Sequence, residues 1–370
     1  MQAESLNKDW RPPAADAFPA YPASWYLFCA SSQLNDQPFS QRMLGRQLVA
    51  YRTAHGQVAV MDAHCAHLGA DLGCGTVVGE TLQCPFHNWR YGTNGVCTSI
   101  PHAAEIPSFA RLGTYPVAER HGSVFFFNGP QPLFPLPFIL GADPADFVAG
   151  KTFRYVADCN WYMNSAHAFD TQHFAAVHDR RLLAPPSIDC PAPYARRNSY
   201  HAEVIGKSTF DRILRVVAGR TVNITLTIWG GNMAVITAGF ARVRSGFLMD
   251  MQPLENGQTL CQGIIYARRA NNLLGAFAPL NLAIRRLFTF GYLADEACRL
   301  RGTRYNPASL GPNDQDMIEY FQWAASLPQT APTFINPAAK EDYDEETDHS
   351  FNVPVPCSSA SAIANAAAKG

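Results

Sequence analysis

The chain has 370 residues, of which 47% are hydrophobic and 16% are charged, and its 29 Lys and Arg nearly balance its 30 Asp and Glu. At roughly 100–200 residues per domain this length predicts two domains, or three at most. The net charge of −1 gives no electrostatic case for a protein that binds nucleic acid or a membrane surface. We see no secretory signal and no apolar run of about 18 residues, and the ten cysteines are too dilute for a disulfide scaffold, so we expect a cytoplasmic chain with reduced thiols.

The first part of the chain predicts a small all-β domain. Residues 1–20 read as a loose lead-in, and short apolar runs between turn residues then predict strands over 25–29, 47–52, 58–62 and 124–128. Four prolines within residues 129–137 predict a rigid connector. We therefore place the first domain at 21–135.

The second part, residues 136–330, predicts an α+β domain. We expect strands over 152–157, 223–229, 233–240, 246–253 and 259–268, a helix over 160–179, and two later helices over 272–300 and 313–325. Consecutive antiparallel strands with flanking helices give this fold class. The tail from 331 to 370 carries an acidic run and then Ser, Ala and Asn, which predicts a low-complexity segment outside the core.

The strongest chemical signal is a pair of short cysteine and histidine motifs. Cys65 and His67 are two residues apart, and Cys84 and His87 follow after a spacer of sixteen residues. Two soft thiolates for one iron and two neutral imidazoles for the other make a Rieske [2Fe–2S] centre. The alternatives are a Cys2His2 zinc site, whose usual spacing differs, and coincidence.

A second cluster of ligand types lies in the predicted helix over 160–179. Asp170, His173 and His178 follow one another at spacings of three and five. Two histidines and a carboxylate on one face of an iron leave positions open for dioxygen and substrate. Residues five apart diverge by about 140° on an ideal helix, so the pair alone is weak evidence, and satisfied core histidines are the ordinary alternative.

Residues 61–70 and 84–91 resemble the Rieske domain of non-haem iron oxygenase α subunits, and segments 23–26, 97–101 and 170–178 are most similar to the aminopyrrolnitrin oxygenase group. That family usually has Gly where this chain has Asn88. Respiratory Rieske carriers have a disulfide between their two loops, but the corresponding residues here are Ala70 and Phe86. The resemblance therefore favours the oxygenase branch, with a helix-grip catalytic domain.

The resemblance also implies a mononuclear Fe(II) site held by His173 and His178. Its third ligand in the family is an Asp on a C-terminal helix with an aromatic residue four positions later, which Asp316 fits. Asp314 and Glu319 compete for this role, and all three acids would also suit the start of a helix, where the dipole favours negative charge.

The resemblance assigns Asp170 a different role. In the family this carboxylate accepts hydrogen bonds from a cluster histidine of one subunit and an iron-binding histidine of the next, here His87 and His173. This arrangement implies a homotrimer. A family acid–Asn pair is replaced here by Ala166 and His167, so proton delivery or pocket shape is expected to differ at that point, and we expect His167 to be a pocket or supporting residue.

The chain has no module for oxidising a nicotinamide, so the resemblance implies a separate NAD(P)H-dependent reductase, with or without a ferredoxin. We expect an oxygenase that uses O2 on a small aromatic or heterocyclic molecule, by N-oxygenation, hydroxylation or demethylation. A Rieske electron carrier and an oxidative cyclase of the same family are the alternative functions.

Overall fold

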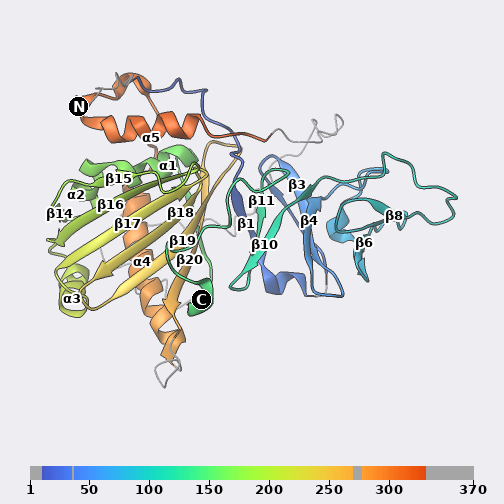
Figure 1. Ribbon diagram of the computed structural model, residues 1–370, viewed down its shortest axis with the longest axis horizontal. Helices are drawn as coiled ribbons and strands as arrows, with labels where there is room; N and C mark the ends of the chain where they lie inside the picture. The colour runs from blue at the N-terminus through green and yellow to red at the C-terminus, as the bar shows by residue number, and fades with distance from the viewer. Residues whose placement is uncertain (1–10, 36, 270–276, 331–370) are drawn as a thin grey trace, which may run out of the picture.

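The computed structural model describes residues 11–35, 37–269 and 277–330. Within these ranges, none of the helices combines the length and the apolar character that crossing a membrane requires. The predicted acidic tail and the first ten residues lie outside the described residues. Figure 1 shows two parts side by side, a large sheet with helices and a smaller all-β part.

The smaller part contains two antiparallel sheets that share a core. One has the order β1-β11-β10 and the other β2-β3-β4-β9. Their strands are β1 (Trp25–Ala30), β2 (Phe39–Met43), β3 (Arg46–Arg52), β4 (Val58–Asp62), β9 (Thr114–Tyr115), β10 (Val117–Arg120) and β11 (Ser123–Phe127). Short 3-10 turns occur at η1 (Ser31–Leu34) and η2 (Leu72–Cys74).

Strand β1 is apolar throughout because both of its faces are buried. Side chains alternate along a strand, and here Tyr26 and Phe28 enter the core between the two small sheets. Trp25 and Leu27 enter a second core, which β1 shares with strands of the large sheet. The sequence run is therefore explained by the packing of the two parts against each other.

A third sheet of the smaller part projects away from the rest of the molecule (Figure 1). It has the antiparallel order β5-β6-β7-β8, with β5 (Thr76–Val78), β6 (Thr81–Gln83), β7 (Arg90–Tyr91) and β8 (Cys97–Ser99). The loop between β6 and β7 holds Cys84 and His87, and the loop after β4 holds Cys65 and His67.

The larger part is built on a nine-stranded antiparallel sheet with the order β12-β20-β19-β18-β17-β16-β14, in which β13 also pairs with β20 and β15 with β16. Its strands are β12 (Phe147–Ala149), β13 (Phe153–Ala157), β14 (Arg180–Leu182), β15 (Ser187–Asp189), β16 (Ala195–Val204), β17 (Thr221–Trp229), β18 (Met233–Phe240), β19 (Arg244–Pro253) and β20 (Thr259–Arg268).

In the described part of the chain five α-helices accompany this sheet, and the long helix α4 crosses one of its faces (Figure 1). They are α1 (Trp161–Ala166), α2 (Thr171–His178), α3 (Thr209–Val217), α4 (Ala278–Arg299) and α5 (Gln315–Ala325). The 3-10 turns are η3 (Pro144–Asp146), η4 (His167–Phe169), η6 (Pro307–Ser309) and η7 (Pro312–Asp314). The α+β class predicted from the sequence is confirmed.

The predicted single helix over 160–179 is divided in the structure. It consists of α1, η4 and α2, with a break at Asp170, whose backbone is extended at φ −90° and ψ 99°. Strand β16 and helix α3 were not predicted. The lead-in differs as well, because residues 11–20 pack on the larger part, where the ring of Phe18 stacks on Tyr162 at 3.8 Å.

A buried polar network joins the two parts of the chain. The Asp250 carboxylate, on β19, accepts hydrogen bonds from the backbone N–H of Leu27 and from Asn232 Nδ2, each at 2.9 Å. Asn232 Nδ2 also donates to the carbonyl oxygen of Trp25 at 2.8 Å. Burial raises the pKa of Asp250 to about 7. These bonds fix the position of β1 relative to the large sheet.

Candidate active site

The four predicted cluster ligands lie on two loops with the same local geometry. In each loop the residue four positions after the cysteine donates its N–H to that cysteine's carbonyl, Gly69 to Cys65 at 2.9 Å and Asn88 to Cys84 at 3.2 Å. Both donors have a positive φ, 78° at Gly69 and 59° at Asn88. Asn is among the few residues that adopt this conformation readily, so it can stand where the family has Gly.

The two loops bring thiols to the inside and imidazoles to the outside. Cys65 and Cys84 are buried, whereas His67 and His87 are exposed, with their Nδ1 atoms 3.1 Å apart. The Tyr91 hydroxyl lies 3.1 Å from Cys65 Sγ, and the ring of Trp89 stacks on His67 at 4.7 Å. Trp89 and Tyr91 therefore pack against the cluster loops. Two buried soft donors beside two exposed imidazoles fit a Rieske cluster whose histidine side faces the protein surface.

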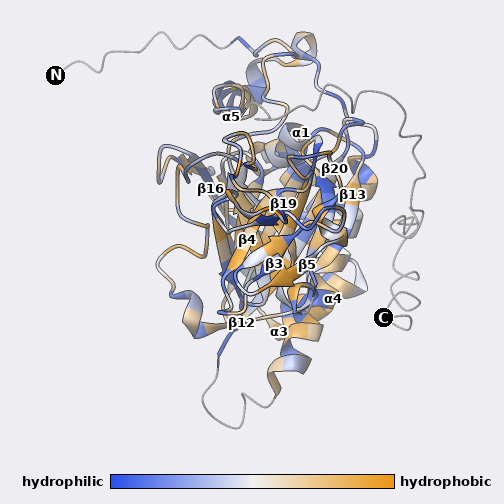
Figure 2. Ribbon diagram, turned by 90° about the vertical axis from the view of Figure 1, so that its right-hand side faces the viewer, coloured by the Kyte–Doolittle hydropathy of each residue, from blue (hydrophilic) through white to orange (hydrophobic). Residues whose placement is uncertain are grey.

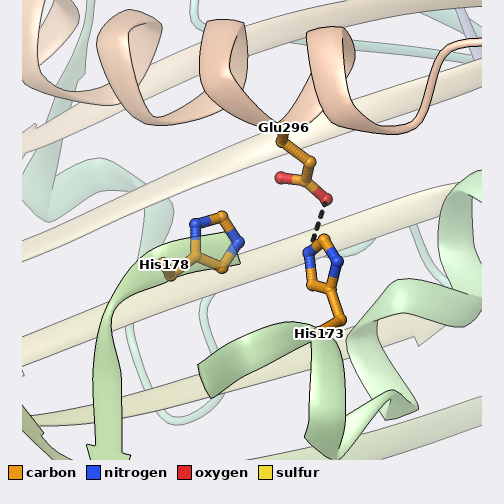
Figure 3. Close-up of side chains that lie close together, drawn as sticks. All are labelled: His173, His178 and Glu296. Atoms are coloured by element: carbon orange, nitrogen blue, oxygen red, sulfur yellow. Dashed lines mark ion pairs between the residues drawn. The ribbon is translucent and has the colours of Figure 1, made fainter. Parts of the chain in front are cut away.

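A second set of ligand types lies between α2 and α4. His173 and His178 come from α2 and Glu296 from α4, and their candidate ligand atoms all lie within 4.8 Å of one another. His173 Nε2 and Glu296 Oε1 are 3.8 Å apart. Figure 3 shows that the carboxylate and the His173 ring point toward each other across the gap between the helices. His178 is the last residue of α2, and its ring centroid lies 5.0 Å from that of His173.

The electrostatics of this group suit a cation. Burial, followed by the neighbouring His173, lowers the pKa of His178 to about 2, so its imidazole is neutral. Burial raises the pKa of Glu296 to about 7. His173 Nε2 is buried and makes no hydrogen bond. A buried acceptor without a partner is costly, and a metal ion between two imidazoles and one carboxylate would satisfy all three groups.

The carboxylate in this group differs from the predicted one. Asp316 is exposed in the first turn of α5 and is not part of the group. Tyr320, four residues later, is buried and stacks on Phe169. Asp314 and Glu319 are also outside the group.

Glu296 was not singled out from the sequence, because no motif used there connects it to the two histidines. The available signal was its place in the predicted helix. Glu296 lies four residues after Tyr292 and three after Leu293, so it continues an apolar face. An acid on the buried face of a helix is unusual and indicates a function.

Asp170 and His167 lie on either side of His173. The Asp170 side chain accepts a hydrogen bond from the His173 backbone N–H at 2.9 Å and so caps α2. The ring of His167 lies 5.0 Å from that of His173, and its Nδ1 lies 3.1 Å from the carbonyl oxygen of Asn164. Burial lowers the pKa of His167 to about 4, so it is a neutral group at the cavity wall.

The three candidate ligands open into a cavity of about 450 Å³ between α4 and the sheet. Its walls are mainly apolar and include Leu226, Ile236, Phe247 and Met249. A buried ion pair, Arg180 with Asp211 at 2.9 Å, joins the end of α2 to the start of α3 beside this cavity. Cavities of this size and polarity hold small molecules in other proteins.

The sequence around the cluster loops matches a known family. Residues 24–110 match the Rieske [2Fe-2S] domain. The chain carries a Rieske domain. This match lies within the predicted first domain, and together with the converging Cys65, His67, Cys84 and His87 it makes a [2Fe–2S] cluster the cofactor of this part.

The relatives of the chain are Rieske oxygenases. It is 38% identical over 189 residues to the aminopyrrolnitrin oxygenase PrnD of Pseudomonas fluorescens. The aligned region covers 48% of this chain and 52% of that protein. The chain is 35% identical to the cholesterol 7-desaturase nvd of Xenopus laevis, covering 45% of this chain and 38% of that protein. The resemblance to Rieske oxygenases, and to the aminopyrrolnitrin oxygenase group, is confirmed. The chain spans about half the length of the first relative and less of the second.

The whole fold also has solved counterparts. The structure of NdmA from Pseudomonas putida CBB5 aligns with a TM-score of 0.60 and 20% identity, covering 82% of this chain and 89% of that one. At this identity the likeness concerns the fold. It extends beyond the Rieske domain into the part that holds His173, His178 and Glu296.

Proposed function

We propose that this chain is the oxygenase component of a Rieske system, in which His173, His178 and Glu296 hold a mononuclear iron. It would use O2 and electrons from a separate NAD(P)H-dependent reductase to oxidise a small, mainly apolar molecule. The observation that carries this proposal is the ligand group at the wall of a 450 Å³ apolar cavity. A chain that only carried electrons would need neither the group nor the cavity.

The two metal centres would divide the chemistry. When bound, the cluster supplies single electrons and the iron activates dioxygen. The residues of this chain prepare both sites. Exposed His67 and His87 provide a short path out of the Rieske domain, and the apolar cavity walls keep bulk water away from the substrate. Tyr292 stacks on His178 at 3.9 Å and holds its ring against α4.

Electron transfer is proposed to run between subunits of a homotrimer. Within one chain, Figure 1 shows the β5–β8 sheet at the opposite end of the molecule from α2. We propose that Asp170 of one subunit joins its own His173 to His87 of the next. An ionised carboxylate between two imidazole N–H groups would fix both rings. The position of Asp170 beside His173 supports this role.

The cavity and the relatives together bear on the substrate. The two relatives are named for aminopyrrolnitrin and for cholesterol, which are both small organic molecules. The mainly apolar walls favour a hydrocarbon-rich substrate, aromatic or heterocyclic, over a charged one. N-oxygenation, hydroxylation and demethylation are the reactions we propose.

Metal content and product mass test the function. Purified protein should hold three irons per chain. An N-oxygenated or hydroxylated product should gain labelled oxygen from labelled dioxygen, whereas a demethylated product should lose one methyl group, which leaves as formaldehyde. Two irons per chain and no turnover would indicate an electron carrier. Loss of two hydrogens without oxygen gain would indicate an oxidative cyclase or desaturase.

The trimer has a separate test. Subunits without the cluster (Cys84→Ser) and subunits without the iron (His173→Ala) should each be inactive, but mixed trimers should recover part of the turnover. The control is a mixture in which both subunit types lack the iron. If verified mixed trimers have no activity, transfer between subunits is rejected.

A further inference from the structure

One face of the larger part exposes two adjacent apolar stripes, which we call the α3–α4 face. Its apolar side chains are Ile213, Val216 and Val217 on α3 and Leu280, Ile284 and Leu287 on α4, all at least 47% exposed. Their spacings place each set on one side of its helix. The rings of Phe210 and Phe288 lie 4.8 Å apart and join the two helices. Figures 1 and 2 both show α3 beside the lower end of α4.

The cavity opens at this face. Val217 and Ile284 line the cavity, yet they are 56% and 49% exposed, so the same side chains belong to the cavity wall and to the surface. Glu296 and Arg285 both line the cavity from α4. Eleven residues of helix separate them, which is about 16 Å. The ligand group therefore lies deep, and the α3–α4 face surrounds the mouth.

The same face concentrates positive charge. Residues 205–220, 240–245 and 277–290 contain eight Lys and Arg but a single acid, Asp211, although the whole chain has a net charge of −1. Asp211 is buried and paired with buried Arg180, so it does not offset the surface charge. Arg212, Arg220 and Arg286 are exposed. Arg212, Arg215, Arg220 and Arg242 together border a shallow depression beside Val216.

We infer that the α3–α4 face rests on the surface of an anionic phospholipid bilayer, and that apolar substrate reaches the cavity from the lipid. A helix surface with exposed apolar side chains and a rim of arginines is the form that lies in a membrane interface. Arginines near an anionic surface are attracted to its headgroups. An apolar patch of this kind on a protein that remained in water would be a liability.

Charge complementarity favours an anionic bilayer over a two-fold contact with a second copy of the chain. A two-fold contact would place the same arginine-rich face against itself, and like charges would oppose it. An anionic bilayer offers both an apolar interior for Val216 and Leu287 and phosphates for the arginines. The contact with lipid does not depend on the iron assignment, because binding to lipid needs neither metal, whereas the delivery of substrate rests on the proposed function.

The test is flotation of the purified full-length protein with vesicles. We expect it to float with vesicles of phosphatidylcholine that contain a third of phosphatidylserine, more weakly with phosphatidylcholine alone, and less in about 1 M salt, where the Debye length is about 3 Å. Arg212→Gln with Arg220→Gln should weaken the partition by roughly 25-fold, about fivefold for each charge. Val216→Ser with Leu287→Ser should weaken it on both vesicle types.

Matched controls lie on other parts of the chain. Leu140→Ser changes a leucine that is as exposed as Leu287. Arg301→Gln changes an exposed arginine just after the C-terminal end of α4, away from Leu280. Both should leave the partition unchanged. Thermal melting of every variant separates a loss of binding from a loss of folding.

Several outcomes would overturn the inference. The inference fails if the wild-type protein does not float with vesicles, or if the arginine and apolar variants of the α3–α4 face bind as well as wild type. It also fails if the protein forms a concentration-dependent dimer that these variants abolish. Binding that appears only in a chain ending at residue 330 would also reject it as stated. In that case the acidic run at 341–346 would be the occupant of the face.

Discussion

Replacing Glu296 with Gln should have two opposite effects, which together identify it as a buried metal ligand. Burial raises its pKa from 4.5 to about 7. Because the folded-state pKa is the higher one, the folded, iron-free protein holds this proton more tightly than the unfolded chain. The free energy of unfolding of the iron-free protein therefore falls as pH rises from about 4.5 to about 7. Above about pH 7 the loss of stability caused by the buried charge is complete.

The size of the penalty follows from the two pKa values. The difference between 4.5 and about 7 corresponds to at most about 3 kcal/mol, and residual exposure of 19% of the side chain reduces it. Gln has nearly the same shape and no charge. Iron-free Glu296→Gln should thus be more stable than iron-free wild type by about 1–3 kcal/mol near pH 8, with little difference near pH 4.5.

Two measurements check this prediction. Urea unfolding of chelator-treated protein at both pH values gives the stability difference, and iron analysis of the untreated protein should show loss of the mononuclear iron with the cluster retained. Asp316→Asn is the control, and because Asp316 is exposed it should keep all its iron. Full iron in Glu296→Gln with iron loss in Asp316→Asn would refute the ligand assignment. Equal stability of the two proteins near pH 8 would refute the reasoning from burial.

Three further predictions concern other buried or constrained groups. Asp250→Asn should flatten the decline in unfolding free energy that we expect between about pH 4 and pH 7, since burial raises the folded pKa of Asp250 to about 7; an unchanged pH profile by urea unfolding would contradict this. Asn88→Gly should keep the cluster and the melting temperature. Asn88→Val should lower the free energy of unfolding by about 1–2 kcal/mol, because the backbone φ at position 88 is 59°. Visible absorbance reports the cluster, and thermal melting reports the stability. Asp170→Asn should keep the cap on α2 and the iron, because Asn caps helices as well as Asp does, while turnover falls by orders of magnitude. Iron loss in that variant would instead make Asp170 a ligand.

The sequence alone located the Rieske centre because its ligands are local. Each pair of donors lies on one short loop, so the spacing from Cys65 to His67 and from Cys84 to His87 already contains most of the geometry. The long strands of the larger sheet were also predictable, since the apolar run of 233–240 coincides with β18. Helix α3, with nine residues, was not predicted, although its apolar side chains recur at helical spacing.

In the structure the carboxylate beside the two histidines is that of Glu296, while the choice between Glu296 and Asp316 as iron ligand stays a prediction. Asp316 has the spacing to an aromatic residue that the family pattern asks for, but the packing of α4 across the sheet brings Glu296 to His173 instead. The distribution of charge was decided in the same way. A net charge of −1 is a sum over the chain, and it does not reveal that folding places Arg212, Arg215, Arg220 and Arg242 around one depression beside Val216. Motifs within one loop are set by covalent spacing, whereas a site assembled from distant segments depends on how helices and sheet pack.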